Sequence, residues 1–226
     1  MSRSTPTARA AAGLFLITWV TSVAAVPLYG GSAFGTDAPL AGRTSVLAAG
    51  LLEVVLAAAV VGTAIALYPL LRPFSPAVAA GYLALRTLEA AVILSGVVAI
   101  LPAVARPSTD AAPGLDAHLV QALHLMHDWT FLVGPGLLNP INAALLATLL
   151  LRRRVVPRIV PWLGLGGAVV VAAMNLAVMF GITKPVPALA VPLFAWEIGL
   201  AATLFVRGLK PPEQARPADH AVPVAA

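Results

Sequence analysis

The chain has 226 residues, of which 60% are hydrophobic and 10% charged, and its mean hydropathy is +0.93. A soluble domain carries about one quarter charged residues, so this composition excludes a soluble globular protein and indicates a polytopic protein with lipid as its solvent. The net charge of +5 does not indicate nucleic-acid binding, because the basic residues are dispersed among short polar segments and form no basic stripe. Cysteine is absent, which excludes disulfides and thiolate chemistry.

The first apolar stretch, residues 10–29, follows a short polar lead over residues 1–9 and is long enough to cross a bilayer. A cleaved signal peptide is the alternative, since a basic start, an apolar core and the short run Ser22, Val23 and Ala24 resemble a cleavage site. The apolar run continues past that site, which favours a retained span.

Four further apolar runs are long enough to span a bilayer, and they cover residues 45–71, 77–101, 158–182 and 186–206. The remaining span, between Leu119 and Leu151, is less regular because it contains Pro135 and Pro140. Each proline removes an amide donor and crowds the carbonyl four residues earlier, so backbone acceptors are freed at membrane depth. We therefore expect an all-α bundle of six transmembrane helices whose fourth helix is kinked or broken, either at a binding site or as a packing kink.

Basic residues near the span ends orient the bundle, because short loops rich in arginine and lysine stay in the cytoplasm. An inside amino terminus gives the cytoplasmic segments Arg3, Arg9, Arg72, Arg152, Arg153, Arg154, Arg158, Arg207, Lys210 and Arg216. The opposite side then carries only Arg43, Arg106 and Lys184. We expect an inner-membrane protein with both termini in the cytoplasm, a transmembrane domain over residues 10–209 and a disordered cytoplasmic tail over residues 210–226.

Four ionisable residues lie inside the predicted spans, where each costs about 2.5 to 3.5 kcal/mol on insertion scales and needs a partner, water or a neutral state. Arg86 and Glu89 are three residues apart on the third span, so they share a helix face and are expected to form an ion pair. Glu53 on the second span and Glu197 on the sixth have no obvious basic partner. Either Arg86 is shared between helices or at least one carboxyl group is protonated.

Depth groups these ionisable residues with three asparagines. An advance of about 1.5 Å per residue along each span places all of them in one layer, from the centre to the outer part of the membrane. We expect this layer to form a mid-membrane polar pocket for a small molecule or an ion, lined by Glu53, Arg86, Glu89, Asn139, Asn142, Asn175 and Glu197. The alternative is that separate interhelical hydrogen bonds only hold the bundle together.

His124, His127 and Asp128 precede Trp129 near the outer end of the fourth span, and their spacing puts them on one helix face. Together with a glutamate from the bundle they are only a weak candidate for a divalent metal site, because two histidines without a fixed third ligand are usually interfacial polar residues. The sequence contains no nucleophile elbow, phosphate loop, metalloprotease helix or dinucleotide fingerprint. It therefore predicts no cofactor.

The order of several short motifs along the chain is informative. The motifs are Leu67 to Pro73, Leu85 to Ala91, Gly134 to Asn142, Val156 to Arg158 and Trp196 to Gly208. In this order they resemble bacterial membrane proteins grouped as domain-of-unknown-function family 4386, over nearly the whole chain. The resemblance implies a six-helix membrane fold and no established activity, substrate or cofactor, and it puts Arg86, Glu89 and Glu197 on polar positions of the family. Pro140 departs from the small or apolar residue expected there.

Two functions of different classes remain open. The first is a membrane protein that binds a small molecule or an ion, such as a transporter or a transporter subunit, and it requires that Glu53, Arg86, Glu89 and Glu197 reach a shared cavity. The second is a structural or regulatory subunit that binds another membrane protein and uses the polar residues only to hold its helices together. An intramembrane enzyme that uses the acidic residues and His127 ranks third.

Overall fold

The structure is a computed structural model that describes residues 4–30, 40–104 and 115–209. Over these ranges the chain is helical and has no strand, and six helical segments are long and apolar enough to cross a membrane. The first three segments are α1 (Ser4–Leu28), α2 (Arg43–Leu71) and α3 (Pro76–Ile100) with the short turn η1 (Leu101–Val104). This confirms the expected all-α fold with six spans.

The other three spans complete the bundle. The fourth is one continuous helical run made of α4 (Ala117–Val133), η2 (Gly134–Leu138) and α5 (Asn139–Arg153). The fifth is α6 (Ile159–Met179), and the sixth is α7 (Val191–Val206), which is preceded by the turn η3 (Pro187–Ala190).

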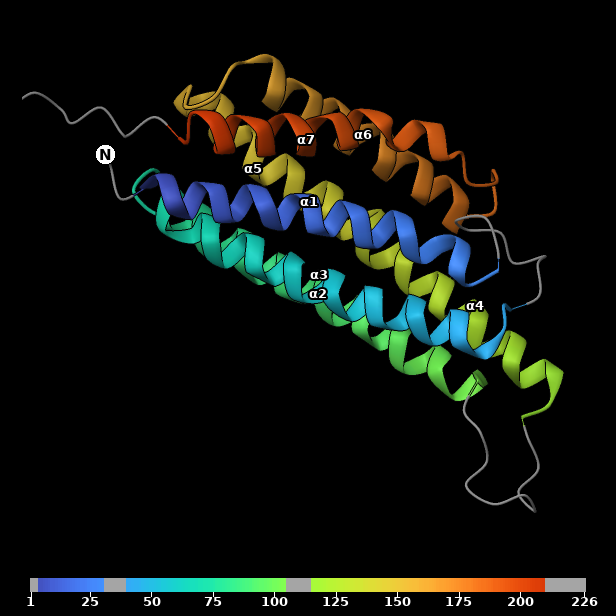
Figure 1. Cartoon of the computed structure of the whole chain (residues 1–226). Coiled ribbons are helices and arrows are strands. Elements are labelled where there is room, and N and C mark those ends of the chain that lie inside the picture. Colours follow the sequence, from blue (N-terminus) through green and yellow to red (C-terminus); the bar gives the residue numbers. More distant parts are fainter. Residues whose placement is uncertain (1–3, 31–39, 105–114, 210–226) are drawn as a thin grey trace, which may run out of the picture.

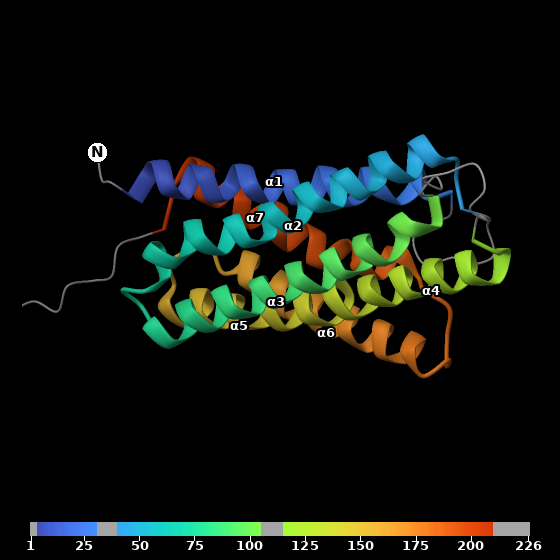
Figure 2. The same ribbon diagram turned by 90° about the horizontal axis from the view of Figure 1, so that it is seen from below.

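Consecutive spans run antiparallel and pack against one another in chain order, and α1 also packs against α7, so the spans form a closed ring (Figure 1). The start of α1, the α2–α3 and α5–α6 connections and the end of α7 lie together at one end of the bundle (Figure 1). Figure 2 shows the same bundle from a perpendicular direction, with α1 along one side and α6 along the other. The six spans therefore surround a common interior.

Helix α1 begins at Ser4, within the segment predicted as a polar lead. Ala8, which lies in that lead, is buried in the main hydrophobic cluster, so packing extends the helix beyond the apolar run. Residues 1–3 of the lead and the predicted tail over residues 210–226 lie outside the described residues.

Side-chain caps fix where two of the spans begin. The hydroxyl of Ser75 accepts a hydrogen bond from the amide of Val78 at 3.3 Å, and Pro76 follows it at the first position of α3. The carboxylate of Asp116 accepts from the amide of Leu119 at 2.8 Å at the start of α4. These caps set the registers of the helices that carry Arg86 and His127.

Two glycines let α6 approach α7 closely. A Cβ atom on Gly167 would lie 2.5 Å from the backbone nitrogen of Leu193, and one on Gly164 would lie 2.7 Å from the indole of Trp196. Such distances are far inside van der Waals contact, so only glycine fits at either position. This packing fixes the rotation of α7 and with it the direction of Glu197.

Pro135 lies within the π-helical turn η2 and Pro140 follows it in α5. In this turn the amide of Asn139 donates to the carbonyl of Gly134. Pro140 has no amide to donate to the carbonyl of Gly136. That carbonyl instead accepts a hydrogen bond from the side-chain amide of Asn175 on α6 at 3.1 Å. A side chain of the neighbouring span thus satisfies a backbone acceptor at membrane depth.

Candidate intramembrane binding site

Arg86 and Glu89 lie one turn apart on the inner face of α3, and both side chains are buried. One guanidinium nitrogen of Arg86 donates to both carboxylate oxygens of Glu89, at 2.9 and 3.1 Å. The guanidinium also lies over the rings of Phe15 and Tyr82, 5.9 and 5.8 Å from their centroids. The structure therefore contains the ion pair that the spacing predicts, held between α1 and α3.

Two asparagines extend this ion pair to other helices. Asn139 accepts from Arg86 at 3.2 Å through its side-chain oxygen, and its amide nitrogen donates to a carboxylate oxygen of Glu197 on α7 at 3.1 Å. Asn142 donates to Glu89 at 2.9 Å. Five residues predicted for the pocket thus form one hydrogen-bonded network that joins α3, α5 and α7.

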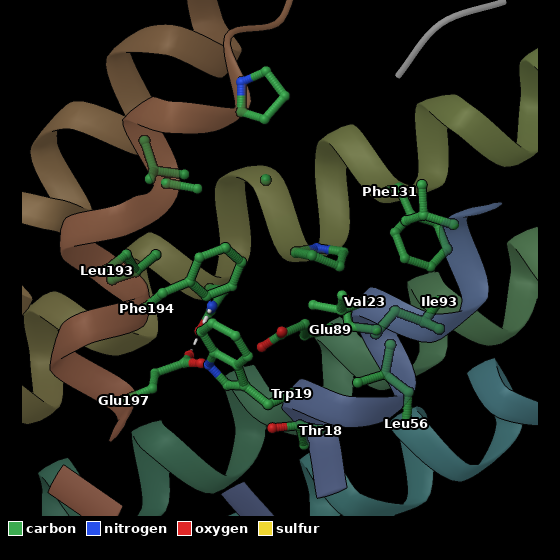
Figure 3. A pocket seen from close by; sticks show the side chains of 18 of the residues that line it. Thr18, Trp19, Val23, Leu56, Glu89, Ile93, Phe131, Leu193, Phe194 and Glu197 are labelled. Carbon is green, nitrogen blue, oxygen red and sulfur yellow. Dashed lines mark hydrogen bonds between the residues drawn. The ribbon is translucent and has the colours of Figure 1, made fainter. Parts of the chain in front are cut away.

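A cavity of about 340 Å³ lies inside the bundle next to this network (Figure 3). It is lined by residues of every span, and five of the seven residues predicted for the pocket are among them: Arg86, Glu89, Asn139, Asn175 and Glu197. Asn142 does not line the cavity but holds Glu89, which does. Glu53 does not line the cavity either.

The cavity has a polar floor and largely apolar walls. Arg86, Asn139 and Glu197 line it near the middle of their spans and form its floor. Leu56, Ile93, Phe131 and Leu193 belong to the walls (Figure 3). The lining continues to Pro27 near the end of α1 and to Pro185 and Pro187 before α7. The cavity therefore extends from mid-depth to the end of the bundle that carries the α6–α7 connection.

Trp19 belongs to this site, although the sequence pattern did not indicate it. Its ring packs edge-on against Phe194, with 4.3 Å between the ring centroids, and Figure 3 shows it turned toward the carboxylate of Glu197. The indole nitrogen is buried and has no hydrogen-bond partner within the described part of the chain. A tryptophan in an apolar span is typical of packing, so only the three-dimensional arrangement identifies it.

Glu53 pairs with His127 instead of with the network at the cavity. Nε2 of His127 lies 3.0 and 3.1 Å from the two carboxylate oxygens of Glu53, and the hydroxyl of Tyr29 donates to the same carboxylate at 2.7 Å. All three side chains are buried. The partner that Glu53 lacks in its local sequence is therefore a histidine 74 residues further along the chain.

His127 also connects this cluster to the cavity wall and to the other candidate metal ligands. Its ring packs on Phe131, which lines the cavity, with 5.1 Å between centroids. An oxygen of Asp128 lies 3.6 Å from Nδ1 of His127 and 3.9 Å from Nε2 of His124. In residues 4–30, 40–104 and 115–209, no group of three or more histidine, aspartate and glutamate side chains is arranged to hold a metal ion.

Comparison with known proteins identifies one family. The family model for DUF4386, a domain of unknown function, matches residues 10–208. No curated protein and no solved structure matches the chain. The match covers most of the first span and all of the other five, and it includes the network of Arg86, Glu89 and Glu197 and the pair of Glu53 and His127.

Proposed function

The chain belongs to the DUF4386 family, and we propose that it is a multi-pass protein of the inner membrane that binds a small molecule in the cavity inside its six-helix bundle. The observation that carries the proposal is the cavity itself, in which a polar floor at mid-depth meets apolar walls. Binding sites for small molecules have this composition: mostly apolar, with a few polar groups that fix orientation. The same binding step would serve a transporter or a transporter subunit.

The proposed orientation puts both termini in the cytoplasm. The described part of the chain carries seven basic residues at the end of the bundle where α1 begins: Arg9, Arg72, Arg152, Arg153, Arg154, Arg158 and Arg207. The opposite end carries Arg43 and Lys184. Because basic loops are retained in the cytoplasm, this asymmetry supports an outward-facing cavity mouth.

The rim of the cavity supports entry from the bilayer or its interface. Val23 lines the cavity and is 54% exposed, and Pro27 and Pro187 are also exposed. In a membrane, exposed apolar residues on a span face lipid chains. A ligand with an apolar body can therefore reach the cavity between α1 and the turn before α7 without crossing water.

A cavity-filling substitution tests the proposal. Ser22 lines the cavity, and Ser22→Phe would put an aromatic ring into it. Val20, two residues earlier on α1, is 67% exposed and does not line the cavity, so Val20→Phe is the matched control. The probe is 1-adamantanol, a compact apolar cage with one hydroxyl group, added to the protein in lipid nanodiscs.

We expect 1-adamantanol to raise the melting temperature of the wild type and of Val20→Phe. At ten times its dissociation constant a ligand stabilises the folded state by about 1.4 kcal/mol. Ser22→Phe should remain folded and lose this response, and native mass spectrometry should find the alcohol bound only to the two responsive proteins. Equal responses of all three proteins, or no response of the wild type, would contradict the proposal.

The second candidate, a structural or regulatory subunit, is favoured by the hydrogen-bonded network itself. Asn139 joins Arg86 on α3 to Glu197 on α7, which is what interhelical stabilisation requires. Such bonds contribute about 0.6 to 2 kcal/mol each and need no charged groups, whereas this network contains three ionisable residues. Co-purification of a stoichiometric membrane partner together with an unresponsive cavity would favour this candidate.

A further inference from the structure

Glu197 is the carboxylate at the cavity that lacks a cationic partner. It is 7% exposed and lines the cavity floor. Across residues 4–30, 40–104 and 115–209, the salt bridges involve Glu53, Glu89 and Asp128 and do not include Glu197. Its hydrogen-bond donor is the neutral amide of Asn139. Leaving a carboxylate unpaired inside a membrane is costly, so Glu197 either takes up a proton or meets a positive charge that the described chain does not supply.

We propose that the cavity selects small apolar molecules that carry a positive charge, such as hydrophobic amines, with Glu197 as their counter-ion. This rests on the proposed function and specifies its ligand class.

The charge balance of the floor agrees with a cationic ligand. Arg86 also lines the cavity, but its charge is balanced by Glu89 at 2.9 Å. When all three groups are ionised, one positive and two negative charges leave a net charge of −1, which is carried by Glu197. A bound cation brings this set to neutrality, whereas a bound anion adds a second uncompensated charge in a low-dielectric interior.

The aromatic residues around Glu197 fit the same ligand. Trp19 and Phe194 lie together beside the carboxylate and line the cavity (Figure 3). Aromatic faces attract ammonium groups, and tryptophan does so most strongly. A carboxylate next to two aromatic rings therefore offers a cation both a counter-ion and a polarisable wall.

The walls exclude Ca²⁺ and Mg²⁺ as the preferred ligand. Metal ions such as Ca²⁺ and Mg²⁺ require about six or more oxygen ligands or retained waters. The cavity offers instead apolar side chains such as Leu56, Ile93 and Leu193 above a small polar floor. An organic cation satisfies both regions, because its charged group meets Glu197 while its apolar body fills the upper cavity.

Three probes with one apolar cage separate charge from shape: 1-adamantylammonium, 1-adamantanol and 1-adamantanecarboxylate. Their dissociation constants are measured by native mass spectrometry and by thermal shift on the wild type and on Glu197→Gln, Glu197→Asp and Glu53→Gln, all in nanodiscs of one lipid composition. Glu53→Gln is the matched control because it also neutralises a buried carboxylate, but one outside the cavity.

We expect the ammonium probe to bind about ten-fold more tightly than the alcohol. A hydrogen bond between charged groups is stronger than a neutral one by about the free energy that a ten-fold change in dissociation constant represents. The carboxylate probe should bind most weakly. Glu197→Gln should remove the preference for the ammonium, whereas Glu197→Asp and Glu53→Gln should retain it. Retention by Glu197→Asp shows that the loss in Glu197→Gln follows from charge and not from misfolding.

Two results overturn this inference. One is equal binding of the ammonium and the alcohol to the wild type, which is expected when Glu197 carries a proton. The other is a preference for the ammonium that survives Glu197→Gln. In both cases the proposed function still stands if 1-adamantanol binds the wild type and Ser22→Phe abolishes that binding. If no probe binds the wild type, the proposed function fails together with the ligand class.

Discussion

Asn175 is expected to stabilise the fourth span because it takes the place of the amide that Pro140 lacks. Its side-chain nitrogen donates to the carbonyl of Gly136 at 3.1 Å and to the carbonyl of Val171 at 2.9 Å. Val171 lies four residues before Asn175 on α6, so its carbonyl has a helical backbone donor as well. The contact that joins α6 to the fourth span is therefore the one to Gly136.

Asn175→Leu keeps the branched shape of the side chain and removes this donor. A buried acceptor left without a partner costs about 1 to 3 kcal/mol, while interhelical hydrogen bonds in membranes contribute about 0.6 to 2 kcal/mol. We therefore expect the free energy of unfolding to fall by about 1.5 kcal/mol. The measurement is reversible unfolding in mixed micelles, followed by circular dichroism or by steric trapping.

A double-mutant cycle with Pro140→Ala tests the physical reason. Alanine at position 140 has an amide that can donate within the helix to the carbonyl of Gly136, so the loss caused by Asn175→Leu should shrink to about 0.5 kcal/mol in that background. A coupling energy of about 1 kcal/mol is expected. Equal losses in both backgrounds would refute the role of Asn175 as the replacement donor.

Three further substitutions test other parts of the structure. His127→Ala leaves the buried carboxylate of Glu53 without its basic partner and should lower the free energy of unfolding by about 3 kcal/mol, and the loss should be clearly smaller when Glu53→Gln is also present. Gly167→Leu should separate α6 from α7, seen as a loss of folded protein in size-exclusion chromatography, whereas Gly166→Leu, where a Cβ atom meets open space, should be tolerated. Ser75→Ala removes the cap of α3 and should cost about 1 kcal/mol in the same unfolding assay, and an unchanged value would contradict the cap.

The spans and the local ion pair could be predicted from the sequence because both depend on short-range pattern. A run of about 20 apolar residues identifies a span whatever its neighbours are. Arg86 and Glu89 are three residues apart, so helical geometry alone brings them together. The irregular region of the fourth span also follows from local chemistry, since Pro135 within the π-helical turn and Pro140 just after it lack amide donors.

Contacts between helices could not be predicted in the same way, because they depend on how each helix is rotated about its axis. The pairing of Glu53 with His127 joins α2 to α4, and no periodicity relates the two residues. The sequence grouped Glu53 with the pocket by depth, but depth does not specify the direction of a side chain. For the same reason Asn139 was expected near the pocket without any indication that it connects Arg86 to Glu197.

Photolabelling with adamantane diazirine tests most directly whether the cavity is a binding site. The reagent is apolar and inserts into whatever side chain it touches, and tandem mass spectrometry locates the adducts. We expect labelling to concentrate on the cavity-lining residues Trp19 and Val26 of α1 and Leu193 and Phe194 of α7. This labelling should fall when 1-adamantanol competes and should disappear from these residues in Ser22→Phe. Labelling confined to exposed apolar residues such as Val20, Leu51 and Phe205, with no protection by the alcohol, would contradict the account.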